Sequence, residues 1–523
     1  MKKYILSIFL LIIILTMSSC IQEGTSSLST NTIYTTKDSV ATVIEDTSTN
    51  KEYDYKIKTA SNVDSRLLYK NMTLKVFDLD IPIYNCKTNF SHTWNAEAPQ
   101  RMNNAVAIVE LEGTARFSLT ATFNVELSCT IRPLSEEIVP EVIDDRNIEF
   151  EISKAGQYTI EFSNDRTLHL FVIEFEKYDS YKDMDNVMYF SPGVHNKTND
   201  KRINSNNRIN LNSNTVVFLD EGAIVEARFE ATNKSNIIIV GYGIVSGANF
   251  DRNANTGTAT VPYDFQYCNN IKFFGISTLD PAGWCYNLFF SNNIEIDDIK
   301  IISSRSNGDG ISLQSCQNVH CSNSFIRSWD DSLVVKNYVS WNNGSEGTTR
   351  NIYFDNCLLW TDLAQSMEIG YETIGEIMDN INFTNITVLH NYHKAPISIH
   401  NGNNANITNV HYKDIVIEDA SMGKGDGKNI LIEIVSEFSS TWSTNHKVTA
   451  VGSIDNVIIE NVTVLFSKNP QVSIRGSYDG RSGYESYHYV TNVVIRNIYI
   501  SGVKLDENYP NLEMKYSNNI TFE

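Results

Sequence analysis

The sequence predicts an all-β protein, in which a right-handed parallel β-helix of about ten coils follows a small antiparallel β-sandwich domain. Helical periodicity is nearly absent from the chain. Short alternating apolar runs occupy residues 67–177, and a loose repeat that begins with asparagine occupies the chain from about residue 186 onward. Because single cores stop growing near about 250–300 residues, a chain of 523 residues is expected to form two domains.

The N-terminus is typical of an export signal. Two lysines follow Met1, an apolar run extends from Tyr4 to Met17, and Ser18 and Ser19 precede Cys20. A membrane-spanning helix is the alternative, but the run of about 14 residues is shorter than the roughly 20 that a bilayer requires. The segment resembles a bacterial lipoprotein signal, although Met17 stands where such signals usually have leucine.

This resemblance implies a signal peptide at 1–20, lipidation at Cys20 and export to the bacterial cell envelope, at the outer membrane or cell surface. Residues 21–62 are rich in serine, threonine and asparagine, so we expect a flexible linker there. The membrane is then contacted only through the lipid anchor.

The predicted sandwich domain covers residues 63–185. Its apolar residues alternate in short runs separated by turn residues, which is typical of strands with one buried face. The clearest runs are 73–77, 105–111, 117–123 and 168–173.

The repeat that predicts the β-helix covers residues 186–523. Each unit begins with asparagine and continues with Ile or Val in an alternating apolar run. Successive starts lie between 23 residues (Asn270 to Asn293) and 47 residues (Asn409 to Asn456) apart, as expected for coils of constant cross-section with loops of different length. Leucine-rich repeats share the period but need spaced leucines and a helix, whereas a plain β-sandwich or propeller is the remaining alternative. The ten starts are Asn236, Asn270, Asn293, Asn318, Asn351, Asn380, Asn409, Asn456, Asn492 and Asn519.

Charge and cysteine content exclude several classes of function. The chain has 42 Lys and Arg against 62 Asp and Glu, and the net charge of −20 repels nucleic acids and anionic lipids. The seven cysteines after Cys20 form no CxxC pair and no disulfide framework. We therefore expect no nucleic-acid partner. No metal, no cofactor and a monomer are also expected.

Three aspartates are the candidate catalytic residues. Asp309 lies 22 positions before Asp331, which is close to one coil, so it should lie on the rung next to Asp330 and Asp331, roughly 4.8 Å away. Carboxyl groups so close repel each other, and at least one should keep its proton at neutral pH. A proton donor beside a base is what cleavage of a glycosidic bond requires. The alternative is that these aspartates are only turn residues between coils.

The motifs Asn307-Gly-Asp309-Gly and Asp330-Asp331 resemble those of the polygalacturonases, glycoside hydrolase family 28. The preceding sandwich and the stretches at 189–194, 214–223 and 239–247 are more similar to family 49, the dextranases and isopullulanase. The resemblance covers about residues 70–420. It implies that Asp330 is the general acid, that Asp309 and Asp331 hold the hydrolytic water, and that the anomeric carbon is inverted.

The departures from the polygalacturonase pattern concern the substrate. The Gly-His-Gly segment of that family is replaced by residues 365–372, without histidine, and its Arg-Ile-Lys clamp for the uronic carboxylate by residues 396–402. A neutral polysaccharide or oligosaccharide such as a dextran-like α-glucan is therefore expected. The expected substrate-binding residues are Trp329, Asn307, Lys336, Glu368, Tyr371, Trp284 and His400.

Three other functions are alternatives. One is a polygalacturonase-like pectin hydrolase. Another is a polysaccharide lyase, which needs a base to remove the C5 proton and calcium or arginine to neutralise the uronate. The third is a non-catalytic glycan-binding protein or adhesin that uses the β-helix as a rigid rod.

Overall fold

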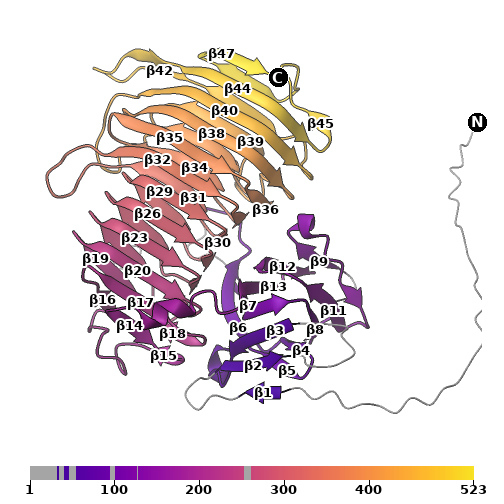
Figure 1. Ribbon diagram of the computed structural model, residues 1–523. Helices are drawn as coiled ribbons and strands as arrows, with labels where there is room; N and C mark the ends of the chain where they lie inside the picture. The colour runs from indigo at the N-terminus through magenta and orange to yellow at the C-terminus, as the bar shows by residue number, and fades with distance from the viewer. Residues whose placement is uncertain (1–31, 35–40, 46–54, 95–100, 126–127, 253–260) are drawn as a thin grey trace, which may run out of the picture.

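The computed structural model describes residues 32–34, 41–45, 55–94, 101–125, 128–252 and 261–523 (Figure 1). Strands dominate, and the helices among these residues are three 3-10 turns: η1 (Ser65–Leu67), η2 (Leu134–Glu136) and η3 (Asp179–Asp183). The predicted all-β class is confirmed. None of the described helices is long and apolar enough to cross a bilayer. The predicted signal peptide and Cys20 lie outside the described residues.

The N-terminal domain is a sandwich of two sheets. Its eight-stranded sheet contains β1 (Thr32–Tyr34), β2 (Ala41–Glu45), β3 (Tyr55–Ala60), β7 (Arg101–Gly113), β13 (Thr167–Glu174), β12 (Gly156–Phe162) and β9 (Cys129–Arg132) in that order, with β6 (Ile83–Asn89) also paired to β7. The five-stranded sheet contains β10 (Glu141–Val142), β11 (Asn147–Ile152), β8 (Ala115–Ala121), β4 (Met72–Val76) and β5 (Leu79–Ile81). The pairing is antiparallel except between β13 and β7.

The linker predicted at 21–62 is too long. Strand β3 pairs with β7, and Tyr55 and Ile57 are buried in the sandwich core. The strand was missed because its alternating Tyr-Lys-Ile-Lys pattern is short and follows a stretch rich in serine and threonine. The sheet therefore begins before residue 63.

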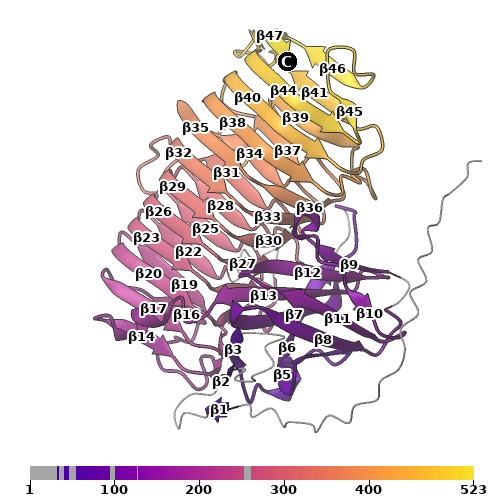
Figure 2. The same ribbon diagram turned by 45° about the vertical axis from the view of Figure 1, so that its right-hand side comes forward.

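The rest of the chain winds into a parallel β-helix with three rows of strands (Figures 1 and 2). The first row contains β14 (Val187–Phe190), β17 (Thr215–Leu219), β20 (Ser235–Gly241), β23 (Asn269–Phe274), β26 (Asn292–Asp297), β29 (Gln317–Ser322), β32 (Thr348–Asp355), β35 (Ile377–Thr384), β38 (Asn406–Ile417), β40 (Ser453–Val464), β44 (Val490–Ile500) and β47 (Ser517–Phe522). The second row contains β15 (Gly193–His195), β18 (Ala223–Val225), β21 (Ile244–Ser246), β24 (Ser277–Leu279), β27 (Lys300–Ile302), β30 (Phe325–Ser328), β33 (Leu358–Thr361) and β36 (Thr387–Asn391).

The third row is a separate sheet of eleven strands. It contains β16 (Arg208–Asn210), β19 (Arg228–Thr232), β22 (Tyr263–Gln266), β25 (Tyr286–Phe289), β28 (Ile311–Gln314), β31 (Leu333–Asn337), β34 (Met367–Thr373), β37 (Ile397–Asn401), β39 (Ile430–Ser436), β41 (Gln471–Arg475) and β46 (Leu512–Lys515). The last coils also carry a hairpin and a short strand. The hairpin consists of β42 (Ser477–Asp479) and β43 (Ser486–His488), and the short strand is β45 (Val503–Lys504). One continuous apolar core fills the interior, so each coil buries its face against its neighbours.

The asparagines that begin the repeat form the ladder that the sequence predicts. All ten adopt left-handed backbone, with φ between 54° and 58°. Asn318, for example, accepts a hydrogen bond at 2.9 Å from the Nδ2 of Asn351 and donates its own Nδ2 to Asn292 at 2.9 Å. Asparagine suits these turns because it tolerates positive φ and can bond to the coil on either side.

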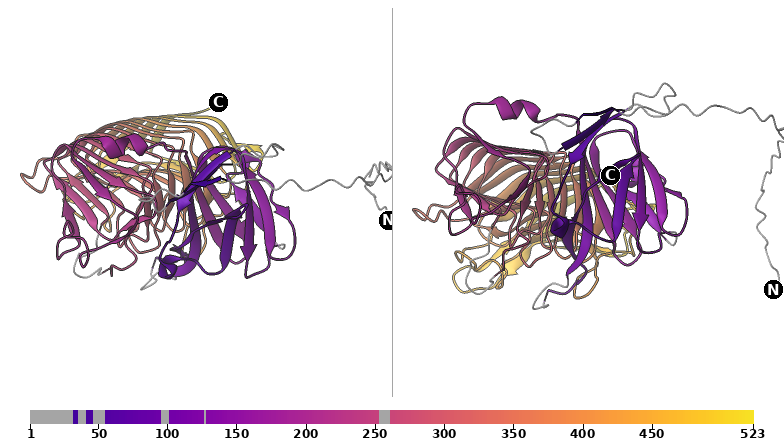
Figure 3. Two further views of the ribbon diagram at one scale, coloured as in Figure 1. Left: turned by 60° about the horizontal axis from the view of Figure 1, so that its bottom comes forward. Right: turned by 90° about the horizontal axis from the view of Figure 1, so that it is seen from below.

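The sandwich packs against the second row of the β-helix (Figure 3). Apolar side chains of β6, β7 and β13 meet those of β18, β21, β24, β27, β30 and β36 in one buried cluster: Tyr84, Cys86, Val106, Phe171, Ile224, Ile244, Leu279, Ile302, Phe325 and Leu389. Since the second row leads into the turns that precede the third row, the sandwich lies beside those turns.

Candidate active site

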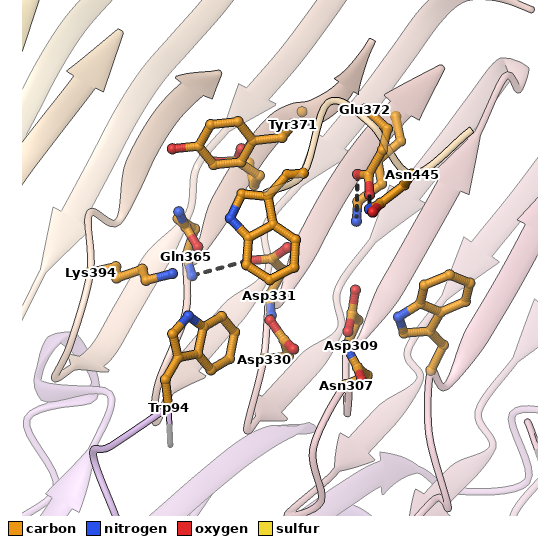
Figure 4. A pocket seen from close by; sticks show the side chains of 15 residues that line it. Trp94, Asn307, Asp309, Asp330, Asp331, Gln365, Tyr371, Glu372, Lys394 and Asn445 are labelled. Carbon is orange, nitrogen blue, oxygen red and sulfur yellow. Dashed lines mark hydrogen bonds and ion pairs between the residues drawn. The ribbon is translucent and has the colours of Figure 1, made fainter. Parts of the chain in front are cut away.

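The three aspartates lie in the turns between the second and third rows. Asp309 precedes β28, while Asp330 and Asp331 connect β30 to β31. The N–H of Gly310 donates to the carbonyl of Asp331 at 2.8 Å, so the two motifs occupy adjacent rungs, as predicted. All three side chains line one cleft (Figure 4). Because Asp330 and Asp331 stand in a turn rather than in a strand, two consecutive side chains can face the same cleft.

The cleft collects side chains from several coils and from the sandwich. Besides the three aspartates it is lined by Trp94, Trp284, Asn307, Lys336, Gln365, Glu368, Gly370, Tyr371, Glu372, Lys394, Trp442 and Asn445. Aromatic rings beside polar groups are the composition that sugar binding requires, because rings cover the C–H faces of a sugar and polar groups bond its hydroxyls.

The environment of the aspartates favours their protonated forms. Burial and the charge of Asp330 raise the pKa of Asp309 well above its ordinary value. Burial, Asp330 and Glu368 raise the pKa of Asp331 to about 8. Burial also raises the pKa of Asp330, although the ammonium groups of Lys394 and Lys336 oppose that rise. The group can therefore hold a proton at neutral pH beside an ionised carboxylate.

Hydrogen bonds orient two of the carboxyl groups. The backbone N–H of Gln365, on the next coil, donates to Oδ1 of Asp331 at 3.1 Å, and the N–H of Asp331 donates to Oδ1 of Asp330 at 3.1 Å. Oδ1 of Asp309 is buried and has no hydrogen-bond partner among the described residues. It is an acceptor that can bind water or a substrate hydroxyl.

A buried histidine balances the acidic side of the cleft. Nδ1 of His400 lies 2.7 Å from Glu368, and its Nε2 lies 3.3 Å from Glu433. Burial alone would lower the pKa of His400, but Glu368 and Glu433 raise it to about 9. The imidazolium, which lies behind the cleft lining, therefore holds Glu368 in place. The ring of Tyr371 stacks on it with centroids 4.2 Å apart.

Lys336 and Glu372 form the opposite wall. Their charged groups lie 3.2 Å apart, and Nδ2 of Asn445 donates a hydrogen bond to Glu372. Burial by itself lowers the pKa of Lys336, but Glu372 raises it well above the ordinary value. Lys336 is therefore a fixed cation beside Asp309 and Asp331.

Comparisons with known proteins identify the family of the chain. The model of the glycosyl hydrolases family 28 matches residues 194–517, which is more than half of the chain. The chain belongs to glycosyl hydrolases family 28. Members of this family are glycoside hydrolases, and the resemblance that the two aspartate motifs predicted is confirmed.

A short part of this family 28 protein is similar in sequence to a dextranase, and its fold is similar to that of other solved structures. A dextranase from Talaromyces minioluteus is 42% identical over 76 residues, which are 14% of this chain and 12% of that protein. The chain thus aligns with about an eighth of that relative's length. Dex49A from Penicillium minioluteum has the same fold, with a TM-score of 0.57, 15% identity, and coverage of 95% of this chain and 100% of the other. An exopolygalacturonase from Thermotoga maritima matches with a TM-score of 0.38 and 14% identity, over 64% of this chain and 84% of the other.

Most of the predicted substrate-binding residues of this family 28 protein line the cleft: Asn307, Lys336, Glu368, Tyr371 and Trp284. Trp329 and His400 do not. Trp329 is 3% exposed and packs behind Trp94, with ring centroids 5.3 Å apart. His400 is buried beneath Tyr371. The structure therefore does not bring Trp329 and His400 into the cleft lining, and their contact with the substrate stays a prediction.

Several cleft residues were missed from the sequence: Trp94, Gln365, Glu372, Lys394, Trp442 and Asn445. Trp94 comes from the sandwich, far from the repeat, and nothing in its surroundings marks it. Trp442 and Asn445 lie in the longest interval of the repeat, between Asn409 and Asn456. That interval was a usable signal, because insertions in solenoids form loops that often line binding sites.

The histidines at 390, 393 and 400 lie close together in the sequence. Each is paired separately: His390 with Glu161 and Asp419, His393 with Asp426, and His400 with Glu368 and Glu433. Across the described part of the chain, no group of three or more His, Cys, Asp or Glu side chains is arranged to hold a metal ion.

Proposed function

We propose that this protein is an inverting hydrolase that cleaves a neutral, dextran-like α-glucan with Asp309, Asp330 and Asp331. The supporting observation is the gathering of three buried carboxyl groups from adjacent coils in one aromatic-lined cleft of a family 28 chain. One carboxyl group donates its proton to the glycosidic oxygen as the bond to the anomeric carbon breaks. Another takes a proton from the water that attacks that carbon from the opposite side, which inverts its configuration.

The charge of the cleft supports a neutral substrate. Five carboxyl groups and two ammonium groups line it, and one ammonium group, that of Lys336, is paired with Glu372. A polyuronate would bring further carboxylates beside these acidic groups, at a cost that grows as water is excluded. A polygalacturonase-like activity is the alternative, and Lys394 is the cation in the cleft that could bind a uronate.

Two arguments bear on which aspartate donates the proton, and they point to different residues. The motif resemblance makes Asp330 the proton donor, with Asp309 and Asp331 holding the water. The pKa of about 8 at Asp331 favours Asp331 as the residue that keeps its proton at neutral pH. We propose Asp330 as the donor. In the free protein the ammonium group of Lys394 opposes protonation of Asp330, and a substrate that binds next to Lys394 changes the surroundings of that charge.

The substrate is tested by measuring reducing ends released from dextran, pullulan and polygalacturonate. Release from dextran or pullulan with initial formation of the inverted anomer, followed by NMR, is the expected result. Release from polygalacturonate alone would overturn the substrate proposal and leave the mechanism standing. An ultraviolet-absorbing unsaturated product identifies a lyase. If the Asp330→Asn variant and the Asp309→Asn variant each keep their activity, the proposed acid–base mechanism is excluded.

The donor is identified with an activated aryl glycoside of the preferred sugar, whose leaving group needs no protonation. The Asp→Asn variant of the donor should regain most of its activity on this substrate, whereas the variant of the water-holding residue should not. Rescue of Asp331→Asn, with none for Asp330→Asn, would exchange the two roles.

We also propose that the protein is exported and anchored to the cell envelope through lipidated Cys20. Incorporation of labelled fatty acid by the wild-type protein, and its loss in Cys20→Ser, is the expected result. Equal labelling of both proteins would contradict this proposal.

A further inference from the structure

Among the described residues of the sandwich, Trp94 reaches the cleft of the β-helix. Trp94 follows β6 by five residues and lines the cleft beside the three aspartates (Figure 4). Its ring centroid lies 6.3 Å from that of Trp442, which belongs to the long insertion of the β-helix. The ammonium group of Lys394 lies 4.3 Å from the centre of the Trp94 ring. Trp94 and Trp442 thus form one aromatic wall built from both domains.

A single carboxylate holds Trp94 in this position. The backbone N–H of Trp94 donates to both oxygens of Asp426, at 3.1 Å each. Oδ1 of Asp426 is also 2.6 Å from Nε2 of His393, the residue before Lys394. Asp426 therefore joins three segments that are distant in sequence: the sandwich loop, the turn between β36 and β37, and the insertion between β38 and β39.

The backbone around Asp426 is closely fitted to the sandwich loop. The N–H of Asp426 donates to the carbonyl of His92 at 3.3 Å. A Cβ atom on Gly425 would lie 1.9 Å from the same carbonyl oxygen, and Gly425 has a φ of +62°. Nδ1 of His92 lies 3.0 Å from the carbonyl oxygen of Asp362 on the second row. The loop that carries Trp94 is therefore fixed at both its backbone and its side chains.

We propose that Trp94 is a glycan-contacting residue supplied by the sandwich, and that Asp426 is a positioning residue that holds it in the cleft. This inference rests on the proposed function and extends it, because it assigns the sandwich a direct part in substrate affinity. An indole at the wall of a sugar cleft covers C–H surface of the ring that it meets, and its contribution depends on where the backbone places it. The sandwich is then part of the binding site and not only a support.

The test measures binding by calorimetry in the Asp309→Asn background, which removes turnover. The probes are isomaltotetraose and tetragalacturonic acid, one for each candidate substrate class. Trp94→Ala should weaken binding of the preferred probe about tenfold, and Trp94→Phe should weaken it less, because a ring remains. Tyr499→Ala removes an exposed aromatic ring on the last coils, 42% exposed, and should leave the dissociation constant unchanged.

The role of Asp426 is tested by a double-mutant cycle. Asp426→Ala alone should weaken binding severalfold, and Asp426→Ala combined with Trp94→Ala should bind no more weakly than Trp94→Ala alone, since the residue that Asp426 positions is already gone. Fully additive losses would overturn the positioning role. Thermal unfolding of each variant identifies any loss of binding that comes from misfolding. Where an alanine variant misfolds, Trp94→Phe and Asp426→Asn are compared instead.

The outcomes separate this inference from the proposed function. If neither probe binds the Asp309→Asn protein, the proposed function fails and the inference fails with it. If a probe binds and Trp94→Ala, folded, binds it equally well, the sandwich takes no part in recognition and only the inference is overturned.

Discussion

Replacing Asp331 by asparagine should make the protein more stable, and increasingly so as the pH rises. In the folded protein, burial, Asp330 and Glu368 raise the pKa of Asp331 to about 8. In the unfolded chain an aspartate has a pKa near about 3.9. At a pH between these two pKa values the folded protein keeps the proton of Asp331, whereas the unfolded chain releases it. Asp331 therefore lowers the stability of the wild type progressively from about pH 4 to about pH 8. Asparagine does not ionise, and its Oδ1 can still accept the hydrogen bond from the N–H of Gln365.

The size of the effect follows from the pKa. A rise of about four units corresponds to about 5–6 kcal/mol at pH 8, since each unit is about 1.4 kcal/mol. A cooperative unit of about 340 residues has an unfolding entropy of about 0.7 kcal/mol/K, so the melting temperature of the variant should exceed that of the wild type by about 8 °C at pH 8. Near pH 4 the two proteins should melt together.

The assay is calorimetric or fluorimetric melting of both proteins at intervals from pH 4 to pH 9. Asp185→Asn, which removes an exposed carboxylate outside the cleft, is the control and should track the wild type. A melting-temperature difference that does not grow with pH, or an Asp331→Asn protein less stable than the wild type at pH 8, would refute the argument that these carboxyl groups are held at the expense of stability.

Three further outcomes are expected. Asp330→Asn should lower kcat by about 10³-fold with an unchanged circular dichroism spectrum, because one acid–base group is lost; a loss below tenfold on reducing-end release would argue against a catalytic role. In the wild type, kcat/KM should rise as the pH rises through about 8, where Asp331 loses its proton and can accept one from the attacking water, and a fall there would make Asp331 the essential acid in place of Asp330. His400→Gln should cost about 3–5 kcal/mol by removing the cation that Glu368 and Glu433 share. Because the pKa of His400 is raised to about 9, its stabilising effect is complete below about pH 6.5 and is lost as the pH rises through about 9, so the variant's deficit in melting temperature should shrink there.

The fold could be predicted because the repeat that forms each coil is visible within a short stretch of sequence. Each coil repeats the same asparagine at the same left-handed turn, so the period is visible even where loops vary, as from Asn409 to Asn456. The register of the aspartates followed from the same rule, since one uninterrupted coil separates Asp309 from Asp331. The short strand at Tyr55–Ala60 was lost because a single alternating run has no repeat to support it.

The rest of the site depends on contacts between segments that are distant in sequence. Trp94 reaches the cleft only because the sandwich docks on the second row and Asp426 holds its backbone. Trp329 stands next to Asp330 in sequence, yet it is buried behind Trp94. Adjacency in sequence and adjacency in the cleft differ here, because the chain turns a corner between the two rows of strands.

The insertion between β38 and β39 and the long insertion between β39 and β40 leave the cross-section of the coils unchanged, since the strands on both sides keep their register. The insertion between β39 and β40 is an exchangeable part: its residues, including Trp442 and Asn445, can be replaced or shortened while the neighbouring rungs stay folded. A lineage built on this scaffold could therefore change the sugar it prefers by altering one loop, with the proton-transfer residues inherited intact.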